Sequence, residues 1–374
     1  MHSCAKRPNE YRLEFKFNMR IPNKYLLITA LLFIEIYGCK EKGTEPPSFK
    51  NPRDYVWTAD TISYKGSFIQ TTMFSIWGSS SNDIYGVGFN NAFENVKLWH
   101  YDGQRWTDIK LFNYQIWPTQ LSAIYGFSSN DIWAAGWSGD LSSQSSGLII
   151  HYDGSKWSEA NINKCSVIND IWGSSPNDIW ACGWTGAVYH FDGIKWNKDS
   201  ISVYLSQGAD FQLLNIRESN SVPFTTGIKV ENNIARWTFY FFKKANQAWQ
   251  TIDSFVVAPG QTTFKFGTRL WTSPNENVYS CSDGVFRWNG NSWEKIFTSS
   301  TSFGSIAGIS EQNFFVVGDY GNVYHYNGSD WYQYQQLKNE NIVYTGVWTD
   351  GNEAFICGFT TNGYPMKTIV WHGK

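Results

Sequence analysis

Residues 171–193 read IWGSSPNDIWACGWTGAVYHFDG, and this pattern recurs along the chain. Two further copies, with insertions, span residues 76–103 and 124–154, and all three lead into Asp-Gly-x-x-Trp. Looser copies lie at residues 270–293, 306–331 and 347–374, and a degenerate copy fits between residues 215 and 249. The chain therefore contains seven units, and internal repetition of this kind is read before any single residue.

Each unit is expected to fold into four short strands, A to D, in chain order. In the quoted unit, strand A begins at Ile171, strand B covers residues 178–183, strand C covers 188–191 and strand D begins at Trp196. An Asp-Gly pair stands between strands C and D and favours the tight turns of β-hairpins. Four-stranded units at roughly 40-residue spacing are typical of propellers. The sequence thus predicts an all-β fold, a seven-bladed β-propeller with four-stranded antiparallel blades.

The two ends of the repeated region complement each other. The last unit stops at Lys374 without a strand D, whereas residues 55–62 have no strand A, B or C before them. Trp57-Thr58 matches the strand-D start at Trp106-Thr107. We therefore expect residues 55–62 to complete blade seven and close the ring, because closure removes exposed strand edges.

The composition fits this architecture and limits the classes of partner that are expected. The 374 residues include Trp 20, Tyr 21 and Phe 26, and hydrophobic residues reach 42%, which supplies a large core and argues against disorder. Charged residues are only 17% and the net charge is −2, without a run of five basic residues. Nucleic acid is therefore not expected as a partner, because its binding requires many phosphates to be neutralised.

The N-terminal segment has the features of a targeting signal. A basic start at Met19-Arg20 precedes an apolar run at residues 25–34, which is short for a membrane span. Tyr37-Gly38-Cys39 resembles a bacterial lipobox, whose cysteine is lipidated. We expect residues 1–18 to be an overcalled start, 19–38 a lipoprotein signal peptide, 39–54 a tether and 55–374 the propeller. A cleaved signal without lipid and an uncleaved anchor are the alternatives.

Cysteine and histidine follow the repeat and do not form metal motifs. Cys182, Cys281 and Cys357 share one register of strand B in blades that are not neighbours, so free thiols are expected. His100, His151, His190 and His325 share a peripheral position two residues before the C–D turn. No Cys-x-x-Cys spacing occurs, and neither a metal nor another cofactor is expected. The Asn-Asp pairs, such as Asn177-Asp178, are read as A–B turns whose side chains bond their own backbone.

Variable loops on a rigid scaffold are where binding usually lies. Insertions gather in the D–A connections and the B–C loops, which share one face of a propeller. Aromatic residues follow the strand-B glycine in four units, and they either wedge between blades or contact a ligand: Phe89, Trp137, Trp184 and Phe359. Within the loops, Tyr114 and Trp117 are the preferred contact residues, because exposed rings stack on sugars or on apolar peptide groups.

The central channel is the second candidate region. One strand-A register is expected to line it and is mostly small: Ser75, Ala123, Asp170, Leu214, Arg269, Ser305 and Gly346. Asp170 and Arg269 are the exceptions and are candidate ligand-binding residues. A glycoside hydrolase needs two carboxylates, and other hydrolases need a metal or a nucleophile with its base. This register offers one acid, so the sequence favours binding over catalysis.

The repeat resembles that of secreted bacterial β-propeller lipoproteins with the pattern Trp-Gly-Ser-Ser-Pro-Asn-Asp-Ile/Val-Trp-Ala-x-Gly…His-Tyr-Asp-Gly-x-x-Trp, often described as galactose-oxidase-like or kelch-like. The likeness covers residues 55–374, and the second half of the unit is similar to tectonin repeats of carbohydrate-binding propellers. The resemblance implies a monomeric binding module, held on the outer membrane by Cys39, for a glycan or an envelope protein. An envelope assembly scaffold and a carbohydrate-active hydrolase or lyase that uses the channel are the alternatives.

Overall fold

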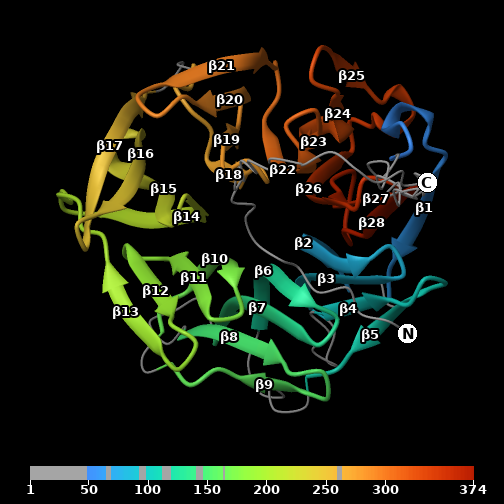
Figure 1. Cartoon of the computed structure of the whole chain (residues 1–374), viewed down its shortest axis with the longest axis horizontal. Coiled ribbons are helices and arrows are strands. Elements are labelled where there is room, and N and C mark those ends of the chain that lie inside the picture. The colour runs from blue at the N-terminus through green and yellow to red at the C-terminus, as the bar shows by residue number, and fades with distance from the viewer. Residues whose placement is uncertain are drawn as a thin grey trace, which may run out of the picture. The chain divides into compact units, whose positions relative to one another are not determined.

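The computed structural model describes residues 49–64, 69–91, 98–111, 119–139, 146–162, 165–258 and 263–374. They form seven four-stranded antiparallel sheets arranged as a ring (Figure 1). The predicted seven-bladed β-propeller is confirmed. Within these ranges the helical segments are short 3-10 turns, and no helix is long and apolar enough to cross a membrane. These turns are η1 (Pro52–Asp54), η2 (Asn232–Ile234), η3 (Asp319–Gly321) and η4 (Gln335–Leu337).

In blades one to six the strands follow chain order from the channel to the rim. Blades one to three consist of β2 (Thr71–Ser80), β3 (Asp83–Asn90), β4 (Leu98–Tyr101) and β5 (Trp106–Ile109); β6 (Thr119–Ser128), β7 (Asp131–Ser138), β8 (Ser146–Tyr152) and β9 (Trp157–Glu159); and β10 (Ile168–Ser175), β11 (Asp178–Gly183), β12 (Ala187–Phe191) and β13 (Trp196–Ser200). Blades four to six consist of β14 (Ala209–Ser219), β15 (Val222–Glu231), β16 (Arg236–Ala245) and β17 (Ala248–Val257); β18 (Arg269–Thr272), β19 (Val278–Cys281), β20 (Gly284–Trp288) and β21 (Trp293–Thr298); and β22 (Phe303–Ser310), β23 (Asn313–Gly318), β24 (Val323–Tyr326) and β25 (Trp331–Gln333).

Blade seven joins the two ends of the described ring. Its order is β1 (Trp57–Ile62), β28 (Thr368–Gly373), β27 (Ala354–Thr360) and β26 (Ile342–Thr349), so β1 is the outer strand, as predicted. Strand β1 pairs antiparallel with β28 from Trp57 opposite Gly373 to Ile62 opposite Thr368. The ring is therefore closed by strands from opposite ends of the sequence.

Ordered contacts begin before β1, within residues that the sequence assigns to the tether. The Arg53 guanidinium donates to both carboxylate oxygens of Asp330, at 3.1 and 2.8 Å. The Tyr334 hydroxyl donates to the Pro52 carbonyl at 2.9 Å, and Pro52 is buried. The structural boundary of the propeller therefore lies near residue 50.

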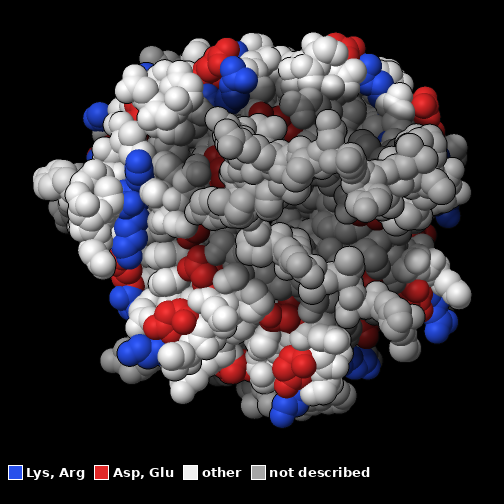
Figure 2. Space-filling view, viewed as in Figure 1, with Lys and Arg blue, Asp and Glu red and all other residues white. Residues whose placement is uncertain are grey.

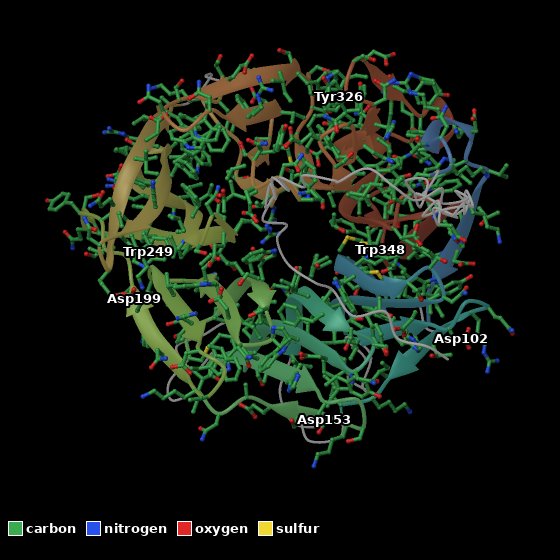
Figure 3. The ribbon with its side chains drawn as sticks, viewed as in Figure 1. Asp102, Asp153, Asp199, Trp249, Tyr326 and Trp348 are labelled. Carbon is green, nitrogen blue, oxygen red and sulfur yellow. The ribbon has the colours of Figure 1, made fainter. Side chains whose placement is uncertain are left out.

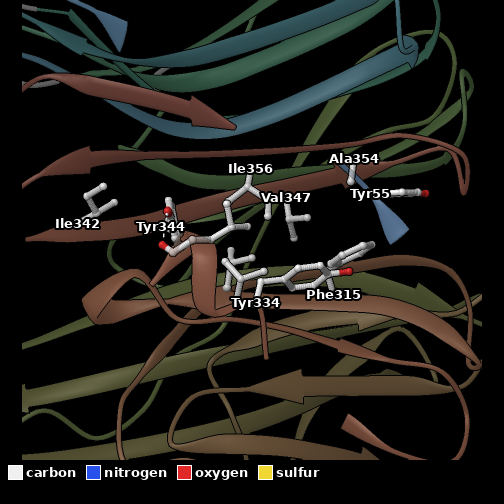
Figure 4. Packing of buried hydrophobic residues seen from close by; sticks show 11 residues of the cluster. Tyr55, Phe315, Tyr334, Ile342, Tyr344, Val347, Ala354 and Ile356 are labelled. Atoms are coloured by element: carbon white, nitrogen blue, oxygen red, sulfur yellow. Dashed lines mark hydrogen bonds between the residues drawn. The ribbon is translucent and has the colours of Figure 1, made fainter. Parts of the chain in front are cut away.

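The core consists of layers between neighbouring blades. Figure 4 shows one such layer, in which Tyr55 and Tyr334 pack with Phe315 of blade six and Ile356 of blade seven. Strand B is covered on both faces by adjacent blades, which explains why β11 is almost wholly apolar. Strand D lies at the rim, and β13 accordingly carries polar residues after Trp196. The aromatic excess of the sequence is thus largely repeated core packing.

The C–D turns form as the Asp-Gly pairs predict. Gly103, Gly154 and Gly193 have φ of 89°, 87° and 84°, which glycine adopts without strain. The preceding aspartate caps the turn: the Asp153 carboxylate accepts the backbone N–H of Ser155 and Lys156, both at 2.9 Å. Figure 3 shows Asp102 and Asp153 at the outer edge of the ring, away from the channel.

The strand-A register is confirmed at six positions and corrected at one. Ser75, Ala123, Asp170, Arg269, Ser305 and Gly346 each pair with the corresponding residue of strand B. In blade four this position belongs to Asn215, which pairs with Thr226, and not to Leu214. Leu214 instead occupies the bulged position just before it, and the same β-bulge precedes this register in blades one, two, three, six and seven. The strand-B thiols Cys182, Cys281 and Cys357 are free and buried, as predicted.

The Asn-Asp pairs do more than shape their turns. Each aspartate carboxylate lies at hydrogen-bond distance from a strand-C imidazole: Asp83 from His100 (2.7 Å), Asp131 from His151 (2.7 Å) and Asp178 from His190 (2.6 Å). Each imidazole also stacks on a strand-B aromatic ring: Tyr85, Trp133 and Trp180, at centroid distances of 4.4, 4.0 and 3.9 Å. The prediction that these aspartates bond chiefly to their own backbone is wrong, because the neighbouring strand presents a better partner. These histidines are part of the blade structure.

One of these aspartates has a second carboxyl group beside it. Burial, the charge of Asp178 and a hydrogen bond with it raise the pKa of Glu218 to about 7. Since folding raises this carboxyl pKa, Glu218 destabilises the fold as pH rises from about 4 through 7. Glu218→Gln should therefore raise the melting temperature at pH 8 and leave it unchanged below pH 4, in calorimetric scans at both values. Glu340→Gln, at an exposed carboxyl, is the control, and an equal gain from Glu218→Gln at both pH values would contradict the assignment.

Candidate functional site

The aromatic residues after the strand-B glycine do not form one surface. Trp137 is buried, with 7% of its area exposed, and acts as a packing residue. Phe89 and Phe359 are partly buried, and the Phe359 ring meets Phe74 edge-on at 6.5 Å. Trp184 is 43% exposed and is the most accessible residue of this set. The predicted loop residues Tyr114 and Trp117 lie outside the described residues.

Trp184 borders a cleft between blades three and four. The cleft has a volume of about 370 Å³ and is formed by the B–C turn of blade three and the D–A connection that leads to β14. Its floor includes the buried side chains of Ile201 and Phe211, and its edge carries Leu205, 45% exposed. The adjacent Tyr204 is 86% exposed. Exposed apolar groups beside an apolar cleft make this the candidate binding surface of the described residues.

The backbone holds this cleft in a fixed shape. The N–H groups of Trp184 and Thr185 donate to the carbonyls of Val167 and Phe211, both at 2.9 Å, which ties the turn to blade four. Gly186 has φ of 72°, and a Cβ there would lie 1.9 Å from the Ile201 carbonyl oxygen. Glycine is therefore required at this position. Trp184 is presented by a rigid turn, which lowers the entropy cost of binding.

The central channel is a polar cavity lined by all seven strands A. Its half on the side of the D–A connections has a volume of about 490 Å³, and the other half about 320 Å³. The first half is lined by polar side chains, which include Ser75, Gln120, Asn169, Gln212 and Ser305. Gln212 also lines the cleft beside Trp184, so the cleft and the channel are adjacent.

Asp170 lies in the channel wall, where hydrogen bonds between blades engage its carboxylate. One oxygen accepts from the Asn215 side chain at 2.7 Å, the Ile216 backbone at 2.9 Å and the Arg217 guanidinium at 2.6 Å. Asn215 in turn accepts from the Leu270 backbone at 2.7 Å, which extends the network to blade five. Asp170 thus joins blades three, four and five.

Arg269, the other predicted channel residue, is exposed. Its guanidinium Nη1 lies 3.5 Å from the Leu214 carbonyl oxygen, the limit of a hydrogen bond. Arg217 lines both halves of the channel as well, and sequence reasoning missed it because the repeat is degenerate in blade four and was aligned there one residue away from the true register. The structure therefore brings Asp170, Arg217 and Arg269 together in one cavity.

The described residues do not assemble a hydrolytic centre around the channel. Its one acid is engaged by three donors, and no group of three or more His, Cys, Asp or Glu side chains in the described ranges could hold a metal ion. Burial raises the pKa of the Cys281 and Cys357 thiols to about 12, so both are protonated at neutral pH and are poor nucleophiles. The arrangement is suited to binding.

Charge on the ring is mixed. On the face drawn in Figure 2, outside the area under grey atoms, Lys and Arg side chains lie mainly near the rim and Asp and Glu side chains also lie further in. Most ion pairs of the described residues lie within one blade, but Lys244 contacts Asp199 of the neighbouring blade at 2.9 Å, and Asp199 also accepts from the Trp249 indole (Figure 3). This view shows no continuous basic patch.

Comparisons with known proteins place the chain by its fold. No protein-family model matches the sequence, and no curated protein matches it. Among solved structures, "YCF48 bound to D1 peptide" is similar with a TM-score of 0.56 at 15% identity, over 87% of this chain and 96% of that one. The WD40 β-propeller domain of Doa1 gives 0.49 at 9% identity, over 83% and 97%. At these identities the likeness shows the propeller fold alone.

Proposed function

We propose that this protein is a non-enzymatic binding module that takes a segment of a protein partner into the cleft between blades three and four. The observation that carries the proposal is the exposed Trp184 ring, held by a rigid turn above an apolar floor. Aromatic residues that are rigid and desolvated on binding dominate interface energetics. The similar propeller YCF48, whose solved structure has a bound D1 peptide, supports this choice of ligand class by analogy.

The segment would lie along the cleft with its apolar side chains against Ile201 and Phe211. Leu205, at the edge of the cleft in the D–A connection, would contact the same segment. The cleft has room for a few side chains, so recognition would use a short stretch of chain. A glycan is the alternative ligand, because exposed Tyr and Trp rings also stack on sugars.

Substitution of Trp184 tests this function. Trp184→Ala should weaken binding of an enriched octapeptide about thirtyfold, the result of losing about 2 kcal/mol at an aromatic anchor. The peptide would be selected from a random octapeptide library on the intact protein, and affinity measured by fluorescence polarisation. Leu205→Ala should weaken the same peptide less, because a smaller apolar group is removed.

Ile194 provides the matched control. It is 88% exposed but lies in the C–D turn of blade three, away from the cleft, so Ile194→Ala should bind as the wild type does. Equal affinity of the wild type and Trp184→Ala would overturn the proposed function. Saturable binding on a glycan array that is lost in Trp184→Ala, without peptide enrichment, would assign the cleft to sugar.

We propose further that the ring is held at the outer membrane by a lipid on Cys39, with the residues up to about 50 as its tether. The support is the lipobox-like Tyr37-Gly38-Cys39, which lies outside the described residues. Mass spectrometry of the mature N-terminus and labelling with a fatty-acid analogue would test the assignment.

A further inference from the structure

The cleft adjoins a channel half that has an unbalanced charge. The charged residues that line this half are Asp170, Arg217 and Arg269. Asp170 and Arg217 neutralise each other through a contact of 2.6 Å, with side chains that are 9% and 19% exposed. Arg269 remains without an acidic partner among the described residues and stands exposed in the cavity. A net positive charge thus faces the channel in a protein whose total charge is −2.

The same half is rich in hydrogen-bond donors. Arg217 uses one guanidinium nitrogen, Nη1, for Asp170 and for the Ile216 carbonyl. Its other nitrogens, and those of Arg269 apart from the weak contact to Leu214, have no partner among the described residues. Gln212 accepts from Asn169 through Oε1, which leaves its Nε2 hydrogens available. Several donors and an uncompensated positive charge are what an anion requires, and an arginine fork fits a carboxylate.

The position of these donors relates them to the cleft. Gln212 lines both cavities, and its backbone forms a β-bridge with Trp184. A segment that packs against Trp184 would therefore end close to the channel, next to Gln212. This half of the channel has a volume of about 490 Å³ and is also lined by Phe74 and Val343, so it has room for a side chain or a chain terminus and not for a folded element.

We propose that the channel binds a carboxylate of the docked segment, with Arg269 as the binding residue and Arg217 and Gln212 as supporting donors. This inference rests on the proposed function of the cleft. The carboxylate belongs either to the C-terminus of the segment or to an Asp or Glu side chain within it. Both sources present the same chemistry to Arg269, and the test separates them.

The probes are random octapeptides in three forms, bound to the intact protein. The first form has a free C-terminal carboxylate and no Asp or Glu, the second has the same sequences with a C-terminal amide, and the third is amidated but contains Asp or Glu. A charge-assisted pair between Arg269 and the peptide carboxylate should give the carboxylate form an affinity about tenfold higher than that of the neutral amides. The preference should weaken between 50 and 500 mM NaCl, since salt screens the interaction.

Arg269→Gln should abolish the tenfold preference, so that acidic and amidated peptides bind equally. Arg269→Lys should retain part of it, because the charge stays and the fork is lost. Arg287→Gln is the matched control: Arg287 is exposed in β20 and pairs with Glu294 outside the channel, so its loss should leave the preference intact. Arg269 makes one weak contact within the fold, and equal melting temperatures of wild type and Arg269→Gln would confirm that folding is preserved.

The outcomes separate the two proposals. Peptide binding that depends on Trp184 but shows no preference for a carboxylate, or a preference that survives in Arg269→Gln, overturns the channel inference and leaves the cleft function intact. Peptide binding that is indifferent to Trp184→Ala overturns the cleft function. Citrate then tests the channel alone: its protection against thermal unfolding should be larger in the wild type than in Arg269→Gln, and equal protection would exclude a carboxylate site.

Discussion

A chain that begins at Ser63 is expected to lose roughly 10 °C or more in melting temperature, because the loss of β1 costs several kcal/mol. The deletion removes all six residue pairs between β1 and β28 and leaves β28 as an exposed edge. It also removes the Trp57 ring, which meets the Tyr334 ring edge-on at 5.4 Å, and the Tyr55 hydroxyl bond to the Gly351 carbonyl. Closure of the ring would then depend only on the packing of blade seven against blades six and one.

Calorimetry on two truncated chains measures this effect. A chain that begins at Phe49 keeps η1, the Arg53 contact with Asp330 and β1, and should melt as the full chain does. If the chain that begins at Ser63 melts at the same temperature as the one that begins at Phe49, closure by β1 does not stabilise the ring. Exposed β28 should also promote self-association, which size-exclusion chromatography detects.

Asp170→Asn is expected to lower the free energy of unfolding by about 3 kcal/mol, because it leaves the half-enclosed Arg217 without its charge partner. The amide also presents an N–H₂ group among three donors that previously shared one acceptor oxygen. Urea unfolding followed by circular dichroism measures the change. The effect should spread over blades three to five, since the network extends through Asn215 to the Leu270 backbone.

Asp199→Asn is the control for this network. Asp199 contacts Lys244 at 2.9 Å across blades, but the two side chains are 36% and 21% exposed, so the loss should stay below about 1 kcal/mol. A loss from Asp170→Asn no larger than that of the control would show that Asp170 is not a structural link. Turnover of a carbohydrate by the wild type that disappears in a folded Asp170→Asn would instead favour the hydrolase or lyase alternative.

Much of the fold could be predicted because its signals are periodic or local. Seven copies of one pattern determine the number of blades, and the Asp-Gly pairs determine the C–D hairpins through their turn preference. The closing strand could be predicted as well, since a missing strand D at one end matches an isolated one at the other. Blade four shows the limit: its repeat is degenerate, so the sequence alignment placed Leu214 where the structure has Asn215, although the bulge before this position is the same as in five other blades.

The candidate site could be predicted only in part. The D–A connection before β14 stood out by its length, Trp184 as one of four aromatic residues after the strand-B glycine, and Arg269 as an exception in the channel register. Which aromatic residue is exposed was not predictable, because Trp137 and Trp184 occupy the same repeat position and differ in the loops and blades around them. The aspartate–histidine pairs were missed for a similar reason, since their partners come from strands that are adjacent only after folding.

The repeats and turn signals were enough to predict a closed ring of seven four-stranded blades and the face on which its loops vary. That Asp170 joins blades, that Arg217 and Arg269 line one cavity, and that an apolar cleft adjoins it became visible only in the folded chain. The physical reason is that strand periodicity and turn preference act over a few neighbouring residues. Burial and charge pairing depend on side chains that lie far apart in the sequence and meet only after folding, as do Asp170 and Asn215, which are 45 residues apart.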